Sequence, residues 1–99
     1  MIRHDDQMRR EGNINAIIDG FMSNNPLSKL QSIAGAVNHS VMNDAIKHQI
    51  EALIDDPSIV MGFRISQLAI AALSKFKFIR YKGDDPTIIK LIQANKWFE

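Results

Sequence analysis

Apolar residues recur every three or four positions along most of this chain, the spacing that places them on one face of an α-helix. The most apolar stretch runs from Pro57 to Tyr81, where such side chains lie on more than one side of the expected helix. Other helices must cover a helix of this kind. The spacing predicts helices over residues 9–22, 26–37, 40–54, 57–82 and 86–97.

Three of the expected helix starts share one local pattern, in which a side-chain oxygen acceptor precedes a proline. They are Asn25-Pro26, Asp56-Pro57 and Asp85-Pro86. The acceptor caps free amide groups of the first turn, and proline lacks the hydrogen that would be unsatisfied there. Ser40 is the expected cap of the third helix.

The spacing of these prolines, 31 and 29 residues, also resembles that of stacked two-helix repeats. The sequence predicts an all-α fold, a compact single-domain bundle of about five helices wrapped around one long central helix over 57–82. A stack of αα repeats is the alternative arrangement. Residues 1–99 have room for one domain, and the polar residues 1–8 are expected to fray at its start.

The stretch 75–82 permits a second interpretation, because its aromatic and β-branched residues alternate with charges as they do in a strand. The sequence shows no strand that could pair with it. Continuation of the central helix to Tyr81 or Lys82 would end at Gly83, a suitable left-handed cap. The helix is therefore the preferred interpretation.

Composition restricts the cellular compartments and the kinds of chemistry that we expect for this chain. The chain has 45% hydrophobic residues and no cysteine, which excludes disulfides and thiolate metal sites. Arg64 and Lys75 interrupt the central apolar stretch, so we expect no membrane span. The start of the chain has no apolar run typical of a signal peptide. We expect a small cytoplasmic accessory protein, of a size that suits a bacterial or phage setting.

Charge is unevenly distributed, although the net charge is only +1. Residues 1–26 carry three basic and four acidic side chains, and residues 27–56 carry two and four. Residues 57–99 carry seven basic and three acidic side chains. An acidic first half and a basic second half favour a partner that is selected by charge.

Candidate catalytic chemistry is sparse. The pairs Asp55-Asp56 and Asp84-Asp85 resemble metal-binding carboxylates, but each precedes a proline at an expected helix start, so capping is the better interpretation. The three histidines lack the spacing of metal ligands, and His39-Ser40 has no orienting acid. No glycine-rich phosphate loop is present. We expect no enzymatic activity, no cofactor and no metal site.

By elimination, the sequence favours a protein-interaction protein, such as an adaptor, inhibitor or assembly factor, with a partner whose surface is acidic. The alternative is a nucleic-acid-binding regulator that uses the basic C-terminal half, where cations alternate with aromatic residues. Residues 26–54 also resemble a helix-turn-helix, but Asp44 and Lys47 stand where apolar packing residues would be needed, and residues 27–56 carry more acidic than basic side chains. Oligomeric state stays open. The candidate partner-binding residues are Lys75, Lys77, Arg80, Lys82, Lys96, Trp97 and Phe98.

Overall fold

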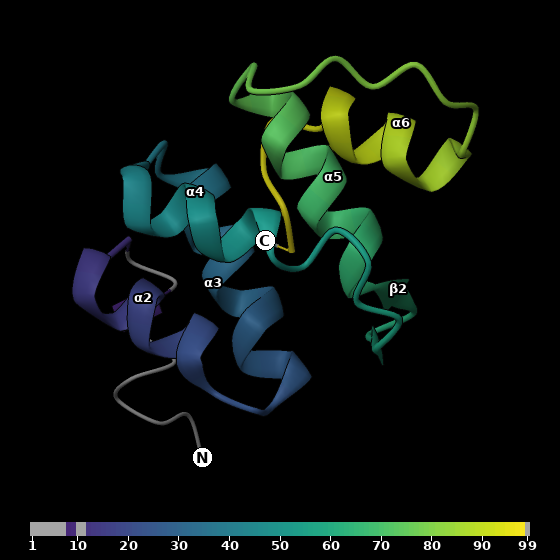
Figure 1. Cartoon of the computed structure of the whole chain (residues 1–99). Helices are drawn as coiled ribbons and strands as arrows, with labels where there is room; N and C mark the ends of the chain where they lie inside the picture. The colour runs from purple at the N-terminus through teal and green to yellow at the C-terminus, as the bar shows by residue number, and fades with distance from the viewer. Residues whose placement is uncertain (1–7, 10–11, 99) are drawn as a thin grey trace.

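The computed structural model describes residues 8, 9 and 12–98, which are mostly helical (Figure 1). Its elements are α2 (Ile14–Met22), α3 (Pro26–Asn38), α4 (Asp44–Glu51), β1 (Ile59–Val60), β2 (Phe63–Arg64), α5 (Ile65–Lys75) and α6 (Pro86–Gln93). Helices α2, α3 and α4 lie together on one side, and α5 and α6 lie on the other. Most of the expected frayed stretch, 1–8, lies outside the described residues.

Local capping chemistry sets most helix starts. Asn25 accepts a hydrogen bond from the Leu27 amide at 3.0 Å, and Asp85 accepts one from the Thr87 amide at 2.9 Å, which confirms two of the three predicted starts. The prediction for Ser40 is wrong. Asn43 caps α4 instead, and its side chain accepts from the Ile46 amide at 2.8 Å.

Ser40 ends the preceding helix rather than starting the next. Its φ is 52°, and the Val41 amide donates to the Ala36 carbonyl at 2.9 Å. This is the Schellman arrangement, in which a left-handed residue lets the chain satisfy the last carbonyls of a helix. The first helix was also predicted too long, because Gly12 has a φ of 80° and α2 begins only after Asn13.

The predicted central helix over 57–82 is wrong at both ends. At its start the chain forms a hairpin in which Val60 pairs with Phe63, and the two turn residues, Met61 and Gly62, have φ values of 53° and 82°. Positive φ at both positions is typical of the two-residue turn whose twist matches paired strands.

Asp56-Pro57 therefore starts no helix. The Asp56 carboxylate accepts from the Ser58 amide at 2.8 Å, and the Asp56 and Ser58 carbonyls accept from the amides of Ser66 and Ile65. Because only two of the three proline sites start helices, the helix starts are not regularly spaced. The structure therefore does not support the αα-repeat interpretation.

The predicted helix also ends early, at Lys75. Lys77 has a φ of 64°, and the Phe78 amide donates to the Leu73 carbonyl at 2.9 Å in a second Schellman arrangement. The following residues, 76–85, form an irregular connection that is neither helix nor strand. Gly83, the predicted cap, lies within this connection, eight residues after the end of α5.

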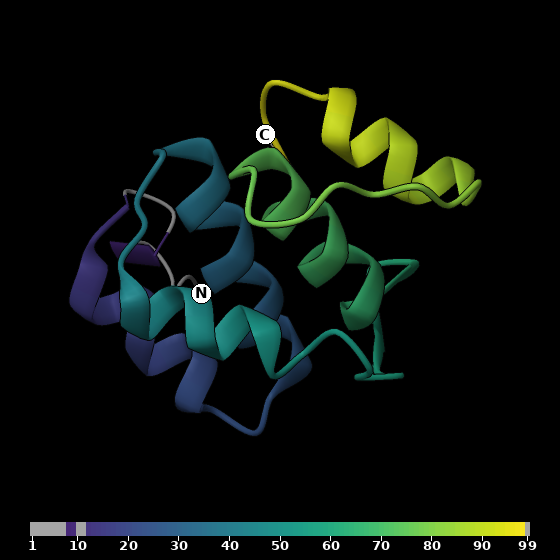
Figure 2. The same ribbon diagram turned by 45° about the horizontal axis from the view of Figure 1, so that its top comes forward.

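The connection joins two helices that run in the same general direction. At their first turns, Gln67 of α5 donates to the Asp85 carboxylate of α6 at 3.0 Å. At their last turns, the Lys75 ammonium donates to the carbonyls of Ile92 and Ala94 at 3.1 and 2.6 Å. Residues 76–85 must therefore travel back along the helix pair, and Figure 2 shows them crossing beside α5 and α6.

The core lies between the two groups of helices and is shared by α3 and α5. Leu30 and Ile33 of α3 and Leu68 and Ala72 of α5 are all buried in one cluster. A bundle wrapped around a single central helix is therefore too simple a description, because α3 is as buried as α5. The predicted last helix, 86–97, ends at Gln93, and the chain then returns to this core.

We predict that Leu68→Ala lowers the free energy of unfolding by about 2–5 kcal/mol, because the side chain is fully buried and its loss leaves a cavity. Ile59→Ala is the control, since Ile59 is 69% exposed, and should change stability by less than about 0.5 kcal/mol. Urea denaturation measures both. Equal effects would contradict the assignment of the core.

Candidate functional site

The structure separates the candidate partner-binding residues into those that hold the fold together and those that face solvent. Lys75 belongs to the first group. Its ammonium group spans the last turn of α6 through the two hydrogen bonds to Ile92 and Ala94, where free carbonyls and the negative end of the helix dipole favour a cation. Lys75, the last residue of α5, thereby joins the C-terminal ends of α5 and α6.

Lys96 and Trp97 are also structural. The Lys96 ammonium donates to the Asn38 carbonyl at 2.6 Å, at the end of α3. Trp97 is only 2% exposed, and its indole donates to the Leu91 carbonyl at 2.9 Å. Its backbone exchanges two hydrogen bonds with the Asn38 side chain, at 2.7 and 2.8 Å. These contacts fix the C-terminal residues against α3.

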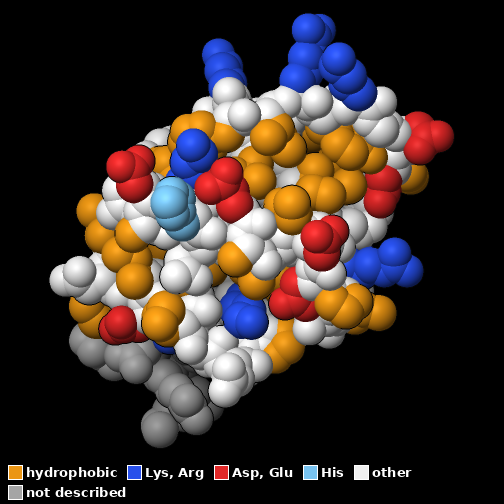
Figure 3. Space-filling model, viewed as in Figure 1, with side chains coloured by type: hydrophobic (Ala, Val, Ile, Leu, Met, Phe, Trp, Pro, Cys, Tyr) orange, Lys and Arg blue, Asp and Glu red, His pale blue; other side chains and the backbone are white. Residues whose placement is uncertain are grey.

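The remaining cations, Lys77, Arg80 and Lys82, are exposed on the connection 76–85. We call these three residues the cationic segment. Figure 3 shows Lys and Arg side chains standing out from the edge of the molecule along which this connection runs. Since the backbone is irregular here, their directions follow the path of the connection rather than the turn of a helix.

Phe98 does not belong to the cationic segment. It lines a pocket of about 520 Å³ beside α3. We call this pocket the α3 groove. Its lining residues are Leu27, Leu30, Gln31, Ala34, Gly35, Asn38, Met61, Trp97 and Phe98. Most of them are apolar. The floor is buried, whereas Leu27, Met61 and Phe98 are exposed around the opening.

The two walls of the groove that do not belong to α3 are held by specific contacts. The Phe98 ring meets the Phe63 ring of β2 edge-on, with 5.2 Å between centroids. The two-residue turn of the hairpin presents Met61, which is 63% exposed. Segments that are far apart in the sequence thus converge on one face of α3.

Leu27 and Met61 were missed in the sequence as binding candidates. Gly62 was a signal for Met61, because a glycine within a predicted helix lowers helix stability by about 1 kcal/mol and often marks a turn. No comparable signal distinguishes Leu27 from the buried apolar residues of α3. Its exposure depends on which other segments cover that helix.

In each aspartate pair, the second residue, Asp56 or Asp85, accepts a hydrogen bond from a backbone amide. Hydrogen bonding from Gln67 is the main cause that lowers the pKa of Asp85, and the amide of Ser58 lowers the pKa of Asp56. Asp56 also lies 3.9 Å from the Lys29 ammonium. Within residues 8, 9 and 12–98, no three histidine or acidic side chains come together as a metal site would require.

No protein-family model matches this chain, and comparison with curated proteins and with solved structures finds no match either. The helices of the described part of the chain are too short or too polar to span a bilayer.

We predict that Lys75→Met lowers the free energy of unfolding by about 1–3 kcal/mol, because two carbonyls of α6 lose a charged donor. Lys77→Met removes an exposed cation two residues away and should cost less than about 0.5 kcal/mol. Denaturant titration of both variants gives the difference. If Lys77→Met were the more damaging, the structural role of Lys75 would be wrong.

Asp85 should make the free energy of unfolding depend on pH in the acidic range. Its pKa is lowered in the folded state, so its contribution is complete above the unfolded pKa of about 3.9 and is lost as the pH falls through the folded value. In thermal melts from pH 6 downward, the melting temperature should fall less in Asp85→Asn than in the wild type, since asparagine still caps the helix without titrating. Identical acid profiles would exclude Asp85 as a contributor.

Proposed function

We propose that this protein is a non-enzymatic interaction protein that binds an apolar segment of another protein in the α3 groove. The observation that carries the proposal is the groove itself, an apolar hollow of about 520 Å³ with three exposed apolar side chains around its opening. Exposed apolar residues that are gathered around a concave surface are typical of binding sites.

The occupant that suits the groove best is the apolar face of a short amphipathic helix. The lining residues of α3 extend from Leu27 to Asn38, a rise of about 16 Å, or three helical turns. A helix of that length presents apolar side chains at every third or fourth position. Ala34, which lines the groove, has only a methyl side chain, which leaves room for such residues to enter.

The alternative function, nucleic-acid binding by the basic second half, is weakened by where its residues lie. Lys75 and Lys96 are engaged with backbone carbonyls. Trp97 is buried, and Phe76 and Tyr81 are packed against the core, so few aromatic faces are free to stack on bases. Of the other exposed cations in this half, Lys77, Arg80 and Lys82 lie together on the connection, whereas Arg64 is on β2 and Lys90 on α6. Three neighbouring cations are fewer than the phosphate contacts that stable duplex binding uses.

The experiment that tests the proposal combines capture and reconstitution. The protein is used to capture partners from its native host, and each captured protein is then purified and titrated by calorimetry. We predict 1:1 binding that weakens at least about tenfold in Met61→Ser/Phe98→Ser, since both side chains border the groove and truncation of central apolar contacts costs more than 1 kcal/mol.

Met22→Ser is the matched control, because Met22 is 68% exposed but lies on α2, outside the groove. It should leave affinity unchanged. Circular dichroism of each variant checks that folding is intact. The proposal fails if the captured partner binds the double variant as well as the wild type, or if purified material carries nucleic acid in place of protein.

A further inference from the structure

The cationic segment forms a second surface, separate from the α3 groove. Lys77, Arg80 and Lys82 are exposed within six residues of an irregular connection. None of them lines the groove, and among the described residues none forms an ion pair with a carboxylate within 4.0 Å. The acidic residues of the same connection, Asp84 and Asp85, come at its far end, where Asp85 caps α6 and accepts from Gln67.

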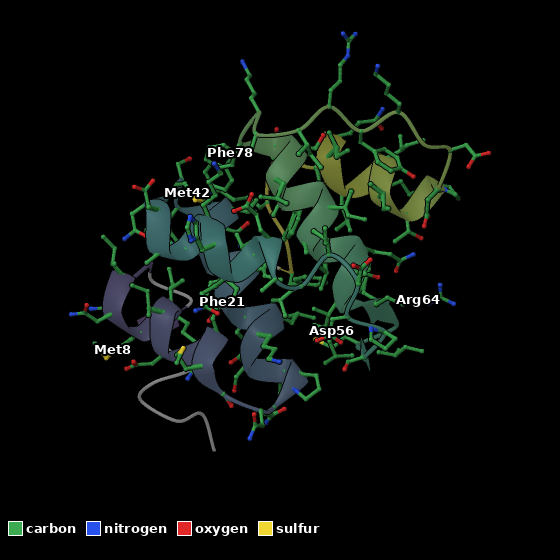
Figure 4. The ribbon with its side chains drawn as sticks, in the orientation of Figure 1. Met8, Phe21, Met42, Asp56, Arg64 and Phe78 are labelled. Atoms are coloured by element: carbon green, nitrogen blue, oxygen red, sulfur yellow. The ribbon has the colours of Figure 1, made fainter. Side chains whose placement is uncertain are left out.

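Apolar side chains lie between these cations. Phe78 and Ile79 are each 42% exposed, and they share a hollow of about 400 Å³ with Ser74, Lys77 and Arg80. Phe78 is held in place from two sides, because its ring stacks on Phe76 with 6.3 Å between centroids and the Lys47 ammonium lies 4.8 Å from its centre. Figure 4 shows Phe78 above α4, away from Arg64 at the opposite side of the molecule.

We infer that the cationic segment is a docking surface for an acidic polypeptide that also carries apolar or aromatic side chains. Carboxylates would meet Lys77, Arg80 and Lys82, and an apolar side chain would enter the hollow beside Phe78 and Ile79. A phosphate backbone suits this surface less well. It would place charged oxygens against Phe78 and Ile79, which are apolar and exposed, and the Phe78 ring is already stacked on Phe76.

The test uses defined probes with the purified protein. Fluorescently labelled poly-L-glutamate, a random glutamate–tyrosine copolymer, an oligothymidylate and a DNA duplex are titrated by anisotropy at low and physiological salt. We expect the copolymer to bind about fivefold or more tightly than polyglutamate, because tyrosine supplies the apolar contact. Both nucleic acids should bind more weakly than the copolymer.

Variants then assign the binding to this surface. Lys77→Gln/Arg80→Gln/Lys82→Gln should weaken copolymer binding at least about tenfold and reduce its salt dependence. Phe78→Ser should reduce the preference for the copolymer and leave polyglutamate binding unchanged. Arg80→Gln and Arg64→Gln form a matched pair, since each removes one exposed arginine, and only Arg80→Gln should weaken binding.

Three results would overturn the inference. They are the absence of saturable copolymer binding, tighter binding of either nucleic acid than of the copolymer, and equal losses in Arg64→Gln and Arg80→Gln, which would indicate attraction by net charge alone. The inference does not rest on the α3 groove. Met61→Ser/Phe98→Ser should bind the copolymer like the wild type, so failure of one surface is distinguishable from failure of the other.

Discussion

The parallel pair α5 and α6 imposes the constraint on which the second half of this protein depends. Two helices that run in the same direction bring their negative C-terminal ends together, which is unfavourable unless a cation or donor lies between them. Lys75 fills that place by donating to the carbonyls of Ile92 and Ala94. At the other ends, the Asp85 carboxylate and the Gln67 amide join the first turns.

The same constraint accounts for the cationic segment. Because α6 starts beside the start of α5, the chain must return over the length of α5, about 16 Å, before α6 can begin. The ten residues 76–85 could span about 33 Å when fully extended, so they cover this distance without being stretched. They lie along the outside of the helix pair, so the side chains of Lys77, Arg80 and Lys82 have few neighbours and face solvent.

The α3 groove depends on a second long-range contact, between Asn38 at the end of α3 and Trp97 near the end of the chain. The Asn38 amide group both donates to and accepts from the Trp97 backbone, and the buried indole anchors the same residue from the other side. Phe98 is thereby held against Phe63 as a wall of the groove. Two residues that the sequence grouped together, Trp97 and Phe98, thus have different roles.

What the sequence by itself determined is local. Asn25 and Asp85 cap helices because their acceptors reach amides only two residues away, and the apolar periodicity identified α3 and the buried residues of α5 because burial follows side-chain chemistry. What only the tertiary structure decided is where the apolar stretch 57–82 breaks. Its periodicity is the same whether the chain continues as a helix or turns. It therefore could not predict the hydrogen bonds from the amides of Ser66 and Ile65 to the carbonyls of Asp56 and Ser58, nor the left-handed backbone of Lys77. Exposure was likewise undetermined, because Lys75 and Lys77 are chemically equivalent until another helix places its last carbonyls beside one of them.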